Sequence, residues 1–134
     1  MQQLTAQELN QMFDSTKWPF FESVEYDFTQ PSILLVHFNI KVDKSLKYFT
    51  GHFPEQAVLP GVVQIHWAGE LARKCLACDG FNNLKKVKFN SVILPMTTLT
   101  LSLSYTPSQG SLSFVYQSKQ QKYSSGLVTF LEQT

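Results

Sequence analysis

One long helical segment constrains this chain more than any other feature. From Gly61 to about Asp79 the apolar side chains recur around most of the helical circumference, so the sequence predicts a helix that is largely buried. The pair Asp79-Gly80 then ends it. After Gly80 every segment is strand-like, so a sheet must supply the surface against which this helix is buried.

The other elements are predicted from alternating patterns and turn residues. Thr5 and Glu8 form a capping box that predicts a short helix over about 6–13, and alternation predicts a strand over 33–43. Further strands are expected over 84–94, 98–105, 111–118 and 123–131, with turns at 107–110 and 120–122. These strands lie too close together for crossover helices, so the sheet is expected to be mainly antiparallel. The fold class is therefore α+β, in a single domain over residues 1–134.

Composition excludes several classes of protein. With 43% hydrophobic and 16% charged residues the chain is ordinary globular material, and a net charge of +1 gives no footprint for nucleic acid. No apolar run approaches the length of a membrane span and the first ten residues are polar, so we expect no membrane insertion and a cytoplasmic location. Cys75 and Cys78 lack a second pair of metal ligands and are interpreted as buried small side chains. No metal and no cofactor are expected.

A motif in front of the long helix carries the candidate chemistry. Gly51-His52-Phe53-Pro54 is followed six residues later by Pro60-Gly61, and the helix then carries His66 at its second turn. A histidine titrates near neutral pH, so two histidines so placed suggest a site for acid–base chemistry. No Ser, Thr, Asp or Asn precedes Gly61 as a helix cap. The N–H groups of Gly61, Val62 and Val63 are therefore predicted to be unpaired and able to face a ligand oxygen.

This segment, GHFPEQAVLPGVVQIHWAGE, resembles the G-H-F-P-x-x-P-V-M-P-G motif of hotdog-fold 3-hydroxyacyl-[acyl-carrier-protein] dehydratases. The resemblance covers most of the chain and implies a curved antiparallel sheet wrapped around a long central helix. It implies a hydro-lyase that converts a 3-hydroxyacyl thioester on an acyl carrier protein to the trans-2-enoyl thioester. The combination of His52 with His66 is most similar to the ApeI-like dehydratases of aryl polyene gene clusters. Hotdog domains usually pair, so a homodimer or a heterodimer with a related hotdog chain is expected.

The resemblance also implies roles for individual residues. His52 is the catalytic base, and the Pro60-Gly61 step together with Val62 binds the thioester. Phe53 is expected to contact the substrate. Other aromatic residues (Phe49, Trp67 and Phe89) either line a tunnel with it or belong to the ordinary core.

The proton donor is where the sequence departs from the family pattern. Members carry Glu or Asp fourteen residues after the motif histidine, whereas this chain has His66, with Glu70 one turn further on. In one interpretation Glu70 hydrogen-bonds His66 and the pair replaces the usual acid. In the other, Glu70 pairs with Arg73 or Lys74 and His66 only lines the pocket. Ala57, where the family usually has proline, is a second departure without an assigned role.

Two other functions remain open at this stage. A hotdog acyl thioesterase would share the fold and the substrate handle but use water as its nucleophile. A non-catalytic subunit that binds an acyl group or a carrier protein would tolerate the change at position 66. The cluster of Lys85, Lys86 and Lys88 is either a solvated edge or a docking patch for an acidic carrier protein.

Overall fold

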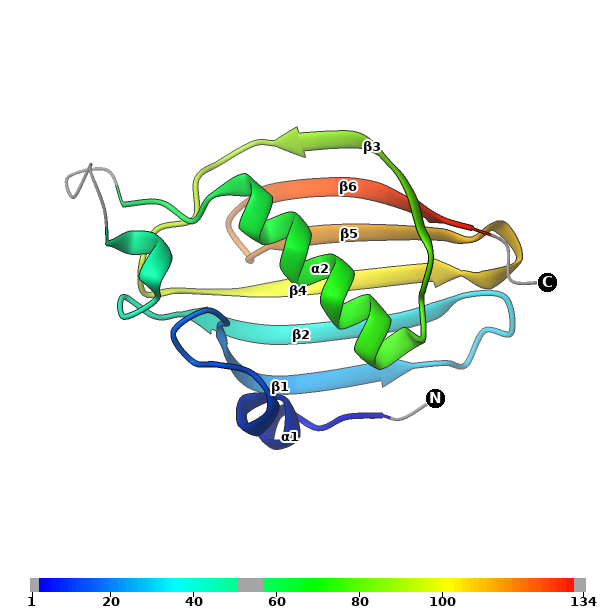
Figure 1. Cartoon of the computed structure of the whole chain (residues 1–134), viewed down its shortest axis with the longest axis horizontal. Helices are drawn as coiled ribbons and strands as arrows, with labels where there is room; N and C mark the ends of the chain where they lie inside the picture. Colours follow the sequence, from blue (N-terminus) through cyan, green and yellow to red (C-terminus); the bar gives the residue numbers. More distant parts are fainter. Residues whose placement is uncertain (1–2, 51–56, 132–134) are drawn as a thin grey trace.

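The computed structural model of the chain describes residues 3–50 and 57–131, which form two α-helices and a six-stranded sheet. The helices are α1 (Ala6–Met12) and α2 (Gly61–Leu76), with short 3-10 turns η1 (Lys47–Phe49) and η3 (Pro107–Gln109). The strands are β1 (Phe20–Asp27), β2 (Leu34–Val42), β3 (Phe81–Phe89), β4 (Thr97–Thr106), β5 (Ser111–Gln117) and β6 (Lys122–Phe130). The long α2 lies across one face of the sheet (Figure 1).

All the strand pairs are antiparallel, in the order β1-β2-β4-β5-β6-β3. Strands β4, β5 and β6 are joined by hairpins, while β3 lies on the far side of β6 and forms one edge (Figure 1). The predicted α+β class, with an antiparallel sheet around a central helix, is confirmed. Strand β3, which follows α2, pairs with β6 and not with β4. In a simple meander it would pair with β4, the next strand in the sequence.

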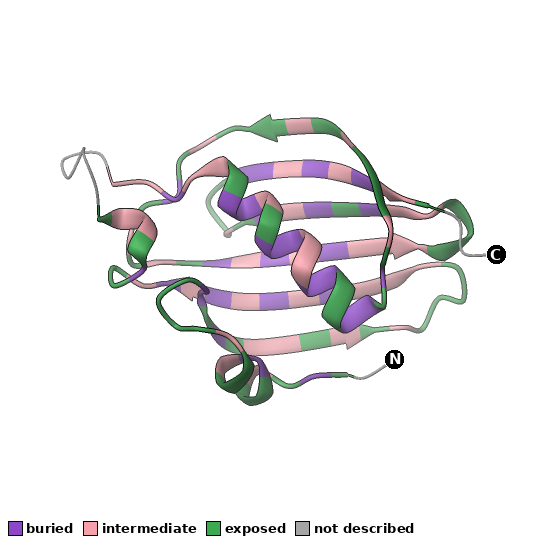
Figure 2. Ribbon diagram, viewed as in Figure 1, coloured by how far each residue is buried: buried purple, intermediate pink, exposed green. Residues whose placement is uncertain are grey.

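The core forms where α2 meets the alternating faces of the central strands. Val36, Phe38 and Ile40 of β2 pair with leucines of β4 and are fully buried. The buried stripe of α2 includes Trp67 and Leu71, so buried and more exposed positions alternate along helix and strands alike (Figure 2). The indole N–H of Trp67 donates to the Lys17 carbonyl at 3.0 Å, which satisfies the polar atom of the largest core side chain.

The structure adds one strand and corrects two boundaries. Strand β1 was not expected, because only Phe21 of its eight residues is buried and an edge strand of this kind shows little alternation. Helix α2 ends at Leu76 rather than Asp79, because Ala77 turns into the left-handed region with φ 57°. Strand β3 covers 81–89 rather than 84–94, and its pairing with β6 is interrupted by two register shifts.

Two smaller predictions are confirmed. Thr5 Oγ1 accepts from the Glu8 N–H at 3.1 Å and Glu8 accepts from the Thr5 N–H at 3.0 Å, which completes the capping box. Cys75 and Cys78 are buried and unpaired, and burial raises the pKa of Cys78 to about 12. A thiol with such a pKa stays protonated near neutral pH and is a poor nucleophile.

Within residues 3–50 and 57–131 no helix is both long and apolar enough to cross a membrane. The same residues contain no cluster of three or more potential metal ligands.

Candidate functional site

The start of α2 is uncapped, as the sequence predicts. Pro60 occupies the N-cap position and offers no side-chain hydrogen bond. Its carbonyl accepts from the N–H groups of Val63 at 3.1 Å and Gln64 at 3.3 Å, so the expectation of an unpaired Val63 N–H is wrong. Among the described residues no acceptor pairs with the N–H of Gly61 or Val62. Two adjacent donors at the positive end of the helix dipole are suited to bind an oxygen that carries partial negative charge.

Gly61 also permits a close contact with the sheet. A Cβ atom at this position would lie 2.5 Å from Cζ of Phe89, far closer than a methyl group can approach a ring. The ring of Phe89 therefore packs on the first residue of α2 while 54% of the side chain stays exposed. This contact accounts for the glycine by packing, alongside the close approach of a carbonyl that the sequence suggested.

A buried polar network, which the sequence analysis missed, holds this helix start in place. Gln64 is 3% exposed; its Nε2 donates to the Leu59 carbonyl at 3.2 Å and its Oε1 accepts from the Ser124 hydroxyl at 2.6 Å. The Tyr116 hydroxyl donates to the Gln64 carbonyl at 2.6 Å. The network thus joins the segment before α2, its first turn and strands β5 and β6. The sequence signal was a lone glutamine on the buried stripe of an apolar helix.

His66 lies about one helical turn beyond Val62, on the exposed side of α2. Its ring centroid is 5.6 Å from that of Trp18, which is itself stacked on Phe13 at 4.0 Å. On its other side His66 borders a groove of about 240 Å³ between α2 and the start of β3. The groove is lined by Ile65, His66, Gly69, Glu70, Arg73, Cys78, Asp79, Gly80, Phe81, Val128 and Phe130.

Glu70 lies in the same groove but bonds to a different partner from the one the first interpretation required. Its carboxylate accepts from Arg73 Nη2 at 2.6 Å and from Arg73 Nε at 3.0 Å. No hydrogen bond joins Glu70 to His66 among the described residues. The pKa of Glu70 lies below its ordinary value, chiefly because of the Arg73 hydrogen bonds, with a smaller contribution from the charge of His66.

The predicted residues therefore fall into three groups. Pro60, Gly61 and Val62 form the helix start, with the Val62 side chain 74% exposed. His66 and Glu70 share the groove, beginning about 7 Å further along the helix by its rise per residue. His52 and Phe53 lie outside the described residues. Of the other aromatic candidates, Trp67 is core, Phe49 is half-buried and Phe89 packs on the helix start.

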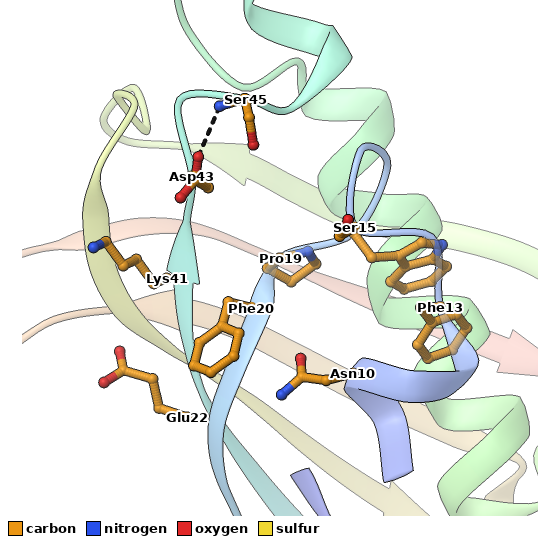
Figure 3. Close-up of a pocket in the computed structure, with 10 residues that line it drawn as sticks. Asn10, Phe13, Ser15, Pro19, Phe20, Glu22, Lys41, Asp43 and Ser45 are labelled. Carbon is orange, nitrogen blue, oxygen red and sulfur yellow. Dashed lines mark hydrogen bonds between the residues drawn. The ribbon is translucent and has the colours of Figure 1, made fainter. Parts of the chain in front are cut away.

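A cavity of about 520 Å³ lies elsewhere, at the corner of α1, β1 and β2 (Figure 3). Two of its polar side chains, those of Asn10 and Asp43, are engaged by backbone groups. Asn10 both donates to and accepts from the Phe21 backbone, and Asp43 accepts from the Ser45 N–H at 2.8 Å. None of the predicted site residues lines this cavity, and its chemistry suggests structure rather than catalysis.

A long helix packed on a six-stranded antiparallel sheet is the architecture of hotdog-fold proteins. A family model described as ApeI dehydratase matches residues 29–127, and the chain belongs to this ApeI-like family.

Known relatives and solved structures agree with this assignment. A 3-hydroxyacyl-[acyl-carrier-protein] dehydratase FabZ from Macrococcus caseolyticus is 32% identical over 73 residues, covering 48% of this chain and 50% of that protein. The chain thus spans about half the length of this relative. A FabZ from Clostridium perfringens is 24% identical over 106 residues, which cover 73% of this chain and 75% of that protein.

Two solved structures have the same fold. An uncharacterized protein from Erwinia carotovora subsp. atroseptica superposes with a TM-score of 0.76 at 30% identity, covering 84% of this chain and 94% of that one. A chain of the dehydratase heterocomplex ApeI:P from Xenorhabdus doucetiae gives a TM-score of 0.69 at 29% identity, covering 84% and 96%.

The glutamine network can be tested by a double-mutant cycle. Gln64→Leu should lower the free energy of unfolding by about 1–3 kcal/mol for each buried group that loses its partner, the Ser124 hydroxyl and the Leu59 carbonyl. Ser124→Ala in the Gln64→Leu background should cost less than in the wild type, with a coupling of about 0.5–3 kcal/mol by urea denaturation. Ser125→Ala, on the opposite face of β6, is the matched control and should be near neutral. Strictly additive costs would show that the two side chains do not interact.

The pairing of Glu70 can be tested by its titration. Arg73→Gln removes the main cause of the lowered pKa, so the pKa of Glu70 should rise towards its ordinary value when measured by carboxyl ¹³C NMR. In the wild type the pair stabilises the fold above the unfolded-state pKa of a glutamate, and this contribution is lost as the pH falls through the lower folded value. Because Arg73 is half exposed and solvent screens the pair, the loss of stability should be small. An unchanged Glu70 pKa in Arg73→Gln would assign the shift to His66 or Lys74 instead.

Proposed function

We propose that this protein dehydrates a 3-hydroxyacyl thioester carried by an acyl carrier protein to the trans-2-enoyl thioester. The observation that carries the proposal is the pair of N–H groups of Gly61 and Val62, unpaired among the described residues at an uncapped helix start. Membership of the ApeI-like family and similarity to FabZ proteins support the same reaction class. We further propose that the substrate belongs to aryl polyene or fatty-acid-like biosynthesis.

The reaction needs three groups, and the chain offers a candidate for each. His52, named here from the sequence alone, takes the proton from C2 of the substrate. The electrons move towards the thioester carbonyl, whose oxygen accepts from the N–H groups of Gly61 and Val62. The C3–O bond then breaks, and the departing hydroxyl receives a proton and leaves as water. The products are the 2,3-alkene and one water molecule.

His66 is our candidate for the proton donor. It lies on the exposed side of α2 next to the helix start, and an imidazolium can deliver a proton near neutral pH. Glu70, four residues further along α2, would support it through its charge rather than through a hydrogen bond, because the carboxylate of Glu70 is engaged by Arg73. Phe53 and Pro60 complete the proposed substrate contacts, the former from the sequence alone.

A second hotdog chain is proposed to pair along β3. This strand is an edge of the sheet, and Phe81 and Phe89 are each more than half exposed at its two ends. An edge strand with exposed aromatic side chains is a template for pairing. Lys85, Lys86 and Lys88 would lie close to their copies in a homodimer, whereas a related chain with a different edge would avoid that repulsion. The pairing is therefore either homodimeric or heterodimeric.

The pairing of Glu70 with Arg73 favours one alternative function, a non-catalytic subunit. The family has a carboxylate at position 66, where this chain has His66. If Glu70 cannot assist His66, no carboxylate takes over that role, and the chain would serve to bind the acyl chain or the carrier protein. The second rival, a hotdog acyl thioesterase, differs in its product.

One assay separates the three functions. The oligomeric state of the purified protein is first measured by sedimentation, alone and after mixing with any hotdog chain that co-purifies with it. Each assembly is then incubated with 3-hydroxyacyl-carrier protein and the product is identified. We expect the enoyl thioester and water as products. The His52→Ala variant should have a kcat lower by a factor of about 10² to 10⁴. Hydrolysis to free acid would instead establish a thioesterase, and binding without turnover in every assembly a non-catalytic subunit.

His37→Ala is the matched control in this assay. His37 is a half-buried histidine on β2 that bonds Ser102 at 2.8 Å and lines no part of the candidate site. It should keep the wild-type rate. A His52→Ala protein with near-native kcat would remove His52 from the mechanism.

A further inference from the structure

Charge is unevenly distributed along this chain. Residues 80–131 contain Lys85, Lys86, Lys88, Lys119 and Lys122 but no Asp or Glu, so all ten acidic residues lie before or after this segment. The segment includes β3, β4, β5 and β6, which form one side of the sheet. A chain with a net charge of only +1 therefore carries a strongly basic surface.

Three of these lysines surround one shallow groove on the face of the sheet opposite α2. We call it the basic groove; it is lined by Lys86, Val87, Lys88, Ser113, Val115, Lys122, Ser125, Gly126 and Leu127. Ser113 and Val115 alternate with buried residues of β5, as Ser125 and Leu127 do on β6, which places them on the outer face. The three lysines are exposed, and the only ion pair among the described residues is the one between Arg73 and Glu70.

The backbone of β3 is distorted at the basic groove. Lys86 has φ 53°, a left-handed conformation that is uncommon for a residue with a side chain. It coincides with the register shift between Lys85 and Lys88 in the pairing with β6. Bulges of this kind redirect side chains and often lie beside functional sites.

The basic groove lies next to the proposed active site, on the other side of the sheet. Lys88 is followed directly by Phe89, whose ring packs on Gly61 at the start of α2. The same pair of residues faces Ser125 and Ser124 on β6, and Ser124 bonds Gln64. A partner seated in the groove therefore has only the end of β3 between itself and the helix start.

We propose that the basic groove is the docking surface for an acidic face of the acyl carrier protein, whose acylated arm passes the end of β3 to reach Gly61 and Val62. This inference rests on the proposed function, since that function supplies the carrier. Charge complementarity identifies the partner. Lysines that form no ion pair within residues 3–50 and 57–131 attract an acidic protein and orient its approach. The outer-face residues between them are small or aliphatic and include no aromatic side chain on which a nucleobase could stack.

The test combines charge reversal with two substrates. Lys86→Glu, Lys88→Glu and Lys122→Glu are made together, with Lys17→Glu, Lys44→Glu and Lys47→Glu as a control of equal charge change on exposed lysines elsewhere. Each protein is assayed with the 3-hydroxyacyl group on the carrier protein and with the same group on a pantetheine thioester. The groove variant should raise KM for the carrier-bound substrate about tenfold or more, and the effect should shrink as salt is added. Its kcat/KM for the pantetheine thioester should match that of the control.

Each other result has a definite reading. Equal losses on both substrates, or the same loss in the control, would overturn the docking proposal, because the lysines would then act on the site or through net charge. If the wild type turns over neither substrate, the proposed function fails, and docking is judged by calorimetry with the acylated carrier protein. Binding that is lost in the groove variant and kept in the control supports docking. Carrier binding that persists in the groove variant, or groove-dependent binding of RNA or anionic vesicles without carrier binding, overturns it.

Discussion

The side chain of one buried glutamine connects the parts of this molecule on which its proposed chemistry depends. Gln64 belongs to the first turn of α2, yet it bonds the backbone before the helix at Leu59 and the hydroxyl of Ser124 on β6. A buried amide stabilises such an arrangement only when its donor and acceptor are both satisfied, as they are here. The helix start is thereby held in one position against the sheet. The N–H groups of Gly61 and Val62, which have no acceptor among the described residues, are then presented by a rigid support. Electrostatic stabilisation of a developing charge requires such a support.

The two faces of the sheet differ in what they place near the start of α2. The inner face buries α2 and, near its start, brings Phe89 onto Gly61 and leaves His66 beside an open groove. The outer face has small polar side chains and collects lysines where β3 bulges. Chemistry on one side and recognition of a charged carrier on the other would meet at the end of β3. This division would account for the absence of Asp and Glu from residues 80–131, where five lysines are left without acidic neighbours in the sequence.

Much of the fold could be predicted from the sequence because its signals are local. The capping box of Thr5 and Glu8, the alternation in β2 and the apolar circumference of α2 each depend on neighbouring residues. Strand β1 was not predicted because an edge strand buries little. The end of α2 was placed too late because Ala77 adopts a conformation that is usually found in glycine.

The uncapped helix start was predicted correctly, but the N–H of Val63 pairs with the carbonyl of Pro60, three residues before it. The partner of Glu70 was left between His66 and its basic neighbours, since all lie within one helical turn and only geometry separates them. The Gln64 network joins residues 60 positions apart, and single-sequence patterns carry no signal for such a pairing.

The central claim is that the thioester oxygen binds at the start of α2. An ¹H–¹⁵N NMR titration with an acyl-pantetheine thioester that lacks the 3-hydroxyl group, and so cannot react, tests it most directly. The account predicts that the amide protons of Gly61 and Val62 move downfield as their N–H groups gain an acceptor, while the amides of Ser113 and Ser125 on the outer face stay in place. Saturable binding that leaves both helix-start amides unmoved, and shifts Asn10 and Phe20 at the α1–β1 cavity instead, would contradict it.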